Sequence, residues 1–237
     1  MSAARPFRSA RSLGTAVIVL LALNVAVLGV LAVFRLLEQA LVSRARRGEL
    51  VSLDEALRSD DRIVAAAVTW IVVLILTGIV WVVWQHRSQS NLRAIGRRDL
   101  TYTPGWAVGW WLIPIANLWM PFKTVRELWK ASGREREWSR SATWPVLGWW
   151  WAAWLAQAVV GRIAAAMLNE AESVAAVATG SRFALLTVLL TIAAAVFAIV
   201  VVRSIVARQE GLEATGVDAD PPPPRPDTAN RSGASGP

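Results

Sequence analysis

The sequence contains no cysteine and a single histidine, His86, among its 237 residues. Disulfide scaffolds, thiolate chemistry and zinc sites built from Cys and His are therefore excluded. Charged residues are also scarce, at 18% of the chain, whereas 55% of the residues are hydrophobic. The hydrophobic residues gather in uncharged blocks of about twenty, which is the length that crosses a bilayer. This distribution excludes a soluble single-domain protein.

Four such blocks are long enough to span a membrane, and they cover about 13–34, 63–84, 144–168 and 183–202, of which only the third contains a charged residue, Arg162 near its end. The sequence therefore predicts an all-α fold, a polytopic membrane bundle of four transmembrane helices. The first block is longer than the apolar region of a signal peptide, about 7–15 residues, and no small-x-small cleavage site ends it. We interpret it as a retained signal anchor.

A fifth apolar segment, 106–122, is interrupted by Pro114, Asn117 and Pro121. Proline removes an amide donor and clashes with the preceding helical turn. In lipid, an interrupted backbone needs polar partners from protein or trapped water. Divided at Pro114, the segment gives two arms of about eight residues, each about 12 Å long if helical. We therefore predict a Pro-broken re-entrant segment in which Asn117 satisfies a backbone group that the break leaves free.

The distribution of basic residues predicts the topology. With both termini in the cytoplasm, 17 basic residues lie inside and seven outside, as the positive-inside rule requires. A five-span form with the N-terminus outside gives 16 against eight, so counting leaves it open. That form would, however, translocate Arg5, Arg8 and Arg11, which directly precede the first span. We therefore expect a multi-pass protein of the plasma membrane with both termini cytoplasmic.

The regions outside the spans complete the predicted organisation. A cytoplasmic tail, 1–12, precedes a membrane domain over 13–207, and residues 208–237, with PPPPRP at 221–226, form a disordered Pro-rich cytoplasmic tail. In the loop 35–62, Ser52 and Glu55 have the spacing of a capping box, which predicts a short surface helix.

An interfacial amphipathic helix is predicted over 121–132. Phe122, Val125 and Trp129 recur at helical spacing on one face. Another face carries the candidate contacts to anionic lipid, Lys123, Arg126 and Lys130. The expected partners are the bilayer with its anionic headgroups, and other membrane proteins or further copies of the chain. Membrane topology accounts for the net charge of +8, so no nucleic acid is expected.

The stretch PGWAVGWWLIPIANLWMPFKTVRELWKAS, at 104–132, resembles the central motif of domain of unknown function family 4328, small multi-span membrane proteins mostly from high-GC bacteria. The stretch WVVWQHRSQSNLRAIG at 81–96 and the tryptophans of 149–154 are similar to further landmarks of that family, and the resemblance covers about 60–205. One departure is Gly133-Arg134, where an Asp or Pro is expected. The resemblance implies a bacterial inner-membrane location and no established activity. It marks a candidate functional motif: Asn91, Trp106, Pro114, Asn117, Trp119, Pro121, Glu127 and Trp129.

Catalytic patterns are missing from the sequence. It has no GxSxG, HExxH, P-loop or paired-carboxylate pattern, and the four spans contain no Asp, Glu, Lys or His. We therefore expect neither enzyme activity nor a cofactor or metal, and interpret the chain as a partner- or lipid-interacting membrane protein. One alternative is a channel or transporter component that uses the broken segment at Pro114 and Asn117. Another is a lipid-modifying enzyme.

Overall fold

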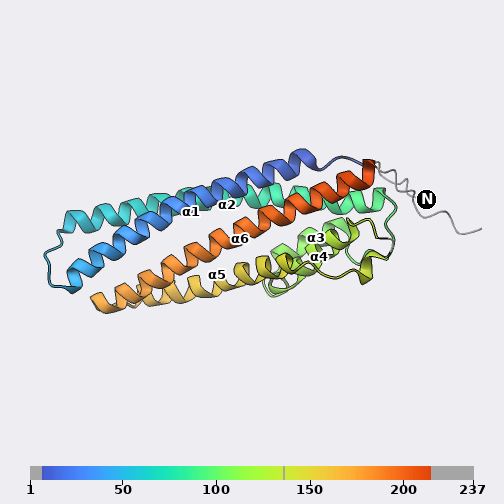
Figure 1. Cartoon of the computed structure of the whole chain (residues 1–237). Coiled ribbons are helices and arrows are strands. Elements are labelled where there is room, and N and C mark those ends of the chain that lie inside the picture. The colour runs from blue at the N-terminus through green and yellow to red at the C-terminus, as the bar shows by residue number, and fades with distance from the viewer. Residues whose placement is uncertain (1–6, 136, 215–237) are drawn as a thin grey trace, which may run out of the picture.

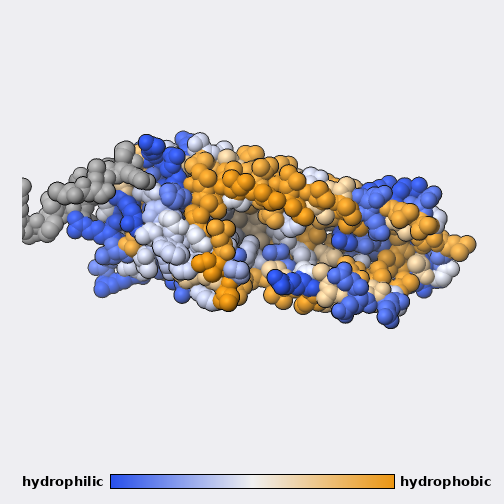
Figure 2. Space-filling model, turned by 180° about the vertical axis from the view of Figure 1, so that it is seen from behind, coloured by the Kyte–Doolittle hydropathy of each residue, from blue (hydrophilic) through white to orange (hydrophobic). Residues whose placement is uncertain are grey.

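The computed structural model describes residues 7–135 and 137–214, and within these ranges every regular element is a helix. The four long helices are α1 (Arg11–Arg46), α2 (Leu53–Ala94), α5 (Pro145–Asn169) and α6 (Val174–Ala214) (Figure 1). Each of them is long and apolar enough to cross a membrane. Hydrophilic residues gather at the two ends of the molecule and hydrophobic residues along its middle (Figure 2). The predicted all-α bundle with four candidate spans is confirmed.

Three of the long helices continue well beyond the apolar blocks. The 42 residues of α2 correspond to about 63 Å, twice the hydrocarbon thickness of a bilayer. Ser52 caps this helix, since its hydroxyl accepts the Glu55 amide and the Glu55 carboxylate accepts the Ser52 amide. The capping box is thus confirmed, but the helix that it begins runs into the span and is no separate surface helix.

The C-terminal end of α6 also differs from the prediction. The helix continues to Ala214, and Gln209 and Leu212 are buried on its inner face. The disordered tail predicted from residue 208 therefore does not begin there, because packing against the bundle extends the helix. Residues 215–237 lie outside the described part of the chain.

The long helices pack as a row in the order α2, α1, α6, α5 (Figure 1). Asn24 on α1 donates a hydrogen bond of 2.7 Å to the Thr77 hydroxyl on α2. At the other side of the row, a Cβ atom on Gly180 would lie 2.7 Å from Leu168 Cδ2, so glycine is what allows α6 to approach α5 this closely. The two outermost helices, α2 and α5, are linked mainly through the segment that connects them.

That connecting segment forms a compact unit at one end of the row. It comprises α3 (Pro104–Gly109), two 3-10 turns (Trp110–Leu112 and Ala116–Leu118) and α4 (Met120–Ala131). A further 3-10 turn, Trp138–Arg140, precedes α5. Because α4 contacts α2, α5 and α6, the unit closes the row at this end.

We expect both ends of the chain and the loop before α5 to be cytoplasmic. The chain has no native cysteine, so single cysteines can replace the exposed residues Ser12, Ala56, Ser139 and Glu172. In intact cells an impermeant maleimide should label Ala56→Cys and Glu172→Cys. It should label Ser12→Cys and Ser139→Cys only after permeabilisation, because the basic residues are retained inside. The reverse pattern would contradict this topology.

Candidate functional site

Residues 104–131 form a helical hairpin, named here the hairpin, whose two arms meet the same residues of α2. Ala107 on the first arm and Thr124 on the second both accept hydrogen bonds from the Gln85 side chain. Four residues further along α2, Gln89 donates to both Tyr102, just before the first arm, and Glu127 on the second. The chain therefore passes down along α2, turns, and returns, as a re-entrant segment must. How deep its turn lies in a bilayer stays a prediction.

The turn of the hairpin differs from the predicted pair of eight-residue helical arms. The first helix ends at Gly109, and 3-10 turns on either side of Pro114 lead to α4, which has Pro121 in its first turn. The carbonyl of Ile113 accepts the backbone amide of Asn117, at 2.8 Å. The Asn117 side chain was expected to donate to a carbonyl that the break leaves free, but it makes no hydrogen bond within the described residues, and its buried Oδ1 has no partner.

Gln85 lies at the centre of the contact between α2 and the hairpin. It is fully buried, and its Oε1 accepts the indole N–H groups of Trp81, at 3.0 Å, and Trp111, at 2.9 Å. Its Nε2 donates to the Ala107 carbonyl and the Thr124 hydroxyl, both at 3.1 Å. A side-chain amide has two donors and one oxygen with two lone pairs. All four positions are therefore occupied, which fixes the first arm, α4 and α2 to each other.

Glu127 makes a second contact of the same kind, one turn further along. Its carboxylate accepts the backbone amides of Thr101, at 2.8 Å, and Tyr102, at 3.2 Å, and the Gln89 amide at 3.0 Å. Burial, and then the charge of Glu127, raise the pKa of the Tyr102 hydroxyl, so Tyr102 stays neutral near the carboxylate at neutral pH. A buried carboxylate with three donors is a structural acceptor that orders the entry to the hairpin.

Tryptophan rings link the hairpin to both outer helices of the row. The Trp111 ring lies 6.0 Å from Trp81 on α2, and 6.2 and 6.0 Å from Trp151 and Trp154 on α5, in edge-to-face geometry. Trp81 also meets Trp150 of α5, at 5.7 Å. Such pairs contribute about 0.5–1.5 kcal/mol each beyond the area they bury. The cluster therefore joins α2 to α5, which otherwise lie at opposite ends of the row.

The second arm of the hairpin is held to α6 by Trp129. Its indole N–H donates to the Ser204 hydroxyl at 3.0 Å, and its ring is stacked on Trp144. The Arg208 guanidinium lies 3.7 Å from the centre of the Trp129 ring and donates to the Trp129 carbonyl. Burial lowers the pKa of Arg208. This cation–π contact and the hydrogen bonds dock α4 along α6.

The orientation of α4 differs from the predicted one. The helix expected over 121–132 is present, but Val125, Leu128 and Trp129 are buried against the bundle. They therefore do not face lipid. Of the expected lipid contacts, Lys123 is exposed, Arg126 is half-buried over the Phe122 ring, and Lys130 donates to the Ser139 carbonyl. An anionic surface can reach Lys123 directly.

The remaining motif residues divide between anchoring and exposure. Asn91 forms a two-way pair with the backbone of Arg8, donating to its carbonyl and accepting its amide, so it holds the segment before α1. Trp106, Trp119 and Pro114 lie on the exposed surface of the hairpin. The structure therefore brings Glu127 and Trp129 into the contact with the bundle, together with Pro121, and leaves the other three at the surface.

Sequence reasoning missed three buried glutamines, Gln85, Gln89 and Gln209. Gln209 on α6 donates to the Ser88 carbonyl and the Ser132 hydroxyl, so it connects α6, α2 and the end of α4. The signal was present, since Gln85 and Gln89 are four residues apart and lie on one face of a helix that leaves the membrane. No group of three or more His, Asp and Glu that could hold a metal occurs within 7–135 and 137–214.

Comparison with protein families identifies one match, to the family described as a domain of unknown function, DUF4328, over residues 47–207. The matched range contains α2, the hairpin, α5 and most of α6, and so includes every contact of Gln85 and Glu127 described above. Comparisons with curated proteins and with solved structures give no match.

Replacing Gln85 by leucine should destabilise the protein. The change leaves two indole N–H groups and the Ala107 carbonyl without their partner, at a cost of about 1–3 kcal/mol in the free energy of unfolding. The matched control is Gln157→Leu, because Gln157 on α5 makes no side-chain hydrogen bond in the described structure. Denaturant unfolding in detergent micelles measures both variants, and equal losses would contradict the role assigned to Gln85.

Replacing Glu127 by glutamine should loosen the entry to the hairpin. The variant keeps the shape of the side chain but loses the charge-assisted hydrogen bonds to Thr101 and Tyr102. Amide hydrogen exchange around these residues should accelerate roughly fivefold or more, as loss of about 1 kcal/mol of local stability implies. Glu172→Gln removes an exposed carboxylate at the other end of the molecule. It should leave this exchange unchanged.

Proposed function

The chain belongs to the DUF4328 family, and we propose that it is a non-catalytic plasma-membrane protein whose hairpin binds the cytoplasmic leaflet. Both termini and the loop before α5 are placed in the cytoplasm by this proposal. The single observation that carries it is the apolar surface on the hairpin turn, which protein does not cover within the described residues.

That surface consists of large side chains on both sides of Pro114. Leu112 is 81% exposed and Ile115 71%, and Trp106, Ile113, Leu118 and Trp119 are also exposed. Soluble surfaces rarely gather apolar side chains in this way, and such patches are typical of contact with membrane or protein. Tryptophan is enriched where a membrane meets water. Lys123, next to this surface on α4, adds a cation that favours an anionic headgroup.

The titratable group of the motif supports a non-catalytic role. Glu127 is 6% exposed and engaged by two backbone amides and Gln89. A general acid or base must reach the proton that it transfers. The Glu127 oxygens instead face the groups that hold the hairpin closed, so the carboxylate stabilises the fold.

Lipid quenching tests whether the turn enters the bilayer. A fluorophore on Leu112→Cys should be quenched strongly by spin-labelled lipid and weakly by iodide, because the exposed leucine would lie among acyl chains. The control is the same fluorophore on Ser139→Cys, in the loop before α5, with the opposite response. Strong quenching by iodide and weak quenching by lipid at Leu112 would contradict the proposal. If the protein also forms oligomers, that result would favour the channel alternative.

Removing cations from α4 tests the preference for anionic lipid. In the full-length protein, Lys123→Gln/Arg126→Gln should reduce the retention of phosphatidylglycerol relative to phosphatidylcholine. The expected loss is roughly fivefold or more, since each cation near a charged surface contributes about 1 kcal/mol. The control pair is Arg87→Gln/Arg203→Gln, which removes two charges near the same end of the bundle. Native mass spectrometry measures the lipid that remains bound. If both double variants retain phosphatidylglycerol equally well, the cations of α4 do not provide the preference for anionic lipid.

A further inference from the structure

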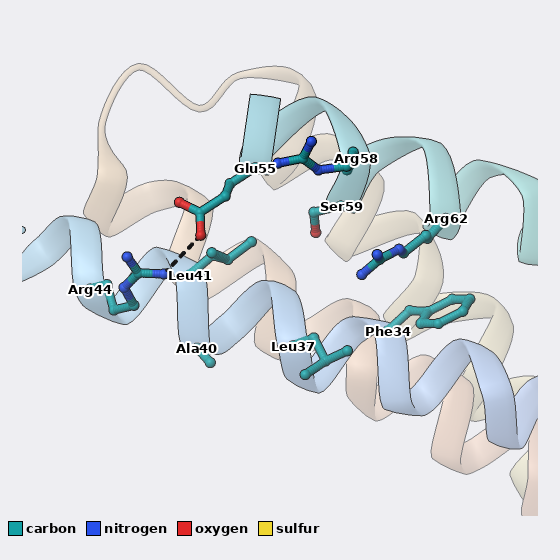
Figure 3. A pocket seen from close by; sticks show the side chains of 9 residues that line it. All are labelled: Phe34, Leu37, Ala40, Leu41, Arg44, Glu55, Arg58, Ser59 and Arg62. Carbon is teal, nitrogen blue, oxygen red and sulfur yellow. Dashed lines mark hydrogen bonds and ion pairs between the residues drawn. The ribbon is translucent and has the colours of Figure 1, made fainter. Parts of the chain in front are cut away.

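A second surface for an amphiphile lies at the opposite end of the bundle from the hairpin. There α1 and α2 line a cavity of about 430 Å³ that is open on one side (Figure 3). Helix α1 contributes the apolar side chains Phe34, Leu37 and Leu41, and α2 contributes Arg58, Ser59 and Arg62. Small-molecule sites have volumes of about 300–1,000 Å³, with an apolar lining and a few convergent polar groups. The cavity fits this description.

The cations of the cavity are not neutralised by its one carboxylate. Glu55 is paired with Arg44 at 3.3 Å, and that hydrogen bond holds the pKa of Glu55 below its ordinary value. Arg62 forms no ion pair or hydrogen bond within the described residues, and Arg58 forms neither, although its charge helps to lower the pKa of Glu55. They lie four residues apart on one helix face, where like charges repel each other. The cavity therefore holds two guanidinium groups that an anion would stabilise.

The position of these cations matches a lipid headgroup. Arg62 directly precedes Ile63, the first residue of the apolar block on α2, so it lies where the span begins. In Figure 3 the Arg62 side chain extends toward α1, above Leu37 and Phe34. A phosphate held by Arg62 and Arg58 would thus have apolar side chains beside it on the membrane side. Basic pockets between transmembrane helices on the cytoplasmic side of membranes bind phosphorylated headgroups by this arrangement. Arginine matches the geometry of phosphate oxygens on either side.

We propose that this cavity binds an anionic phospholipid, with its phosphate at Arg58 and Arg62 and the start of its acyl chains against Leu37 and Phe34. In the topology expected from the sequence, the lipid belongs to the outer leaflet. The site is independent of the hairpin and of the function proposed for it, because none of its residues contacts the hairpin. Its ligand enters laterally from the bilayer and needs no aqueous path.

A fluorophore placed in the cavity tests this site, because it reports lipid bound there and does not respond to lipid bound at the hairpin. Ala40 lines the cavity and is exposed, so an environment-sensitive probe on Ala40→Cys reports binding there. Didecanoyl-phosphatidylglycerol is titrated into the full-length protein in neutral detergent, in parallel with didecanoyl-phosphatidylcholine and inorganic phosphate. Phosphatidylglycerol should bind more tightly than either. Equal affinity for phosphatidylcholine, or for phosphate alone, would overturn the proposal.

Substitution of the two arginines completes the test. In the probe background, Arg58→Gln/Arg62→Gln should weaken phosphatidylglycerol binding roughly tenfold or more and phosphatidylcholine binding much less, because only the first lipid has a net negative charge. The control is Arg46→Gln/Arg182→Gln, which removes two exposed cations from the same end of the bundle. If the control pair weakens binding equally, general charge is responsible and the site is refuted.

Unfolding without lipid separates loss of binding from loss of fold. Because Arg58 and Arg62 repel each other, their replacement should leave the lipid-free protein as stable as before or slightly more stable. The stabilisation by added phosphatidylglycerol, which follows binding to the folded state, should be lost. A double variant that retains this stabilisation would overturn the site even if its fluorescence changed.

Discussion

The structure depends on one requirement, that polar groups removed from water find partners inside the protein. Gln85 meets it for three segments together, because its single amide accepts two indole N–H groups and donates to a carbonyl and a hydroxyl. Glu127, together with Gln89, repeats the arrangement one turn further along α2. Gln209 does the same for α6, which it joins to Ser88 on α2 and to Ser132 at the end of α4. The interrupted backbone between α3 and α4 follows the same requirement, since the Asn117 amide donates to the Ile113 carbonyl and the Trp151 indole donates to the Leu118 carbonyl.

This network also decides the shape of the bundle. Four helices in a row would leave α2 and α5 apart, and the hairpin joins them through the tryptophans around Trp111. At the opposite end no such unit is inserted, and α1 and α2 line an open cavity with three arginines and one carboxylate. The two ends therefore differ in chemistry. One presents apolar side chains with a cation beside them, and the other presents cations above an apolar lining.

The roles of the motif residues follow from this packing. Glu127 and Trp129 are buried against α2 and α6, where they hold the hairpin in place. Trp106 and Trp119 remain exposed on the hairpin itself. A motif that combines buried anchors with an exposed apolar turn is consistent with a hairpin that is positioned rigidly in order to meet a surface.

The sequence by itself determined the four spans, the capping box at Ser52, the break at Pro114 and the helix after Pro121. These features depend on hydropathy, helix capping and proline geometry, all of which act within a few residues. Only the tertiary structure decided which way α4 faces and that Asn117 is not the group that satisfies the break. It also decided that α6 continues past residue 208 and that the glutamines meet the hairpin. Each of these depends on residues far apart in the chain, because a buried polar group is stabilised by whichever partner the packing brings within hydrogen-bond distance.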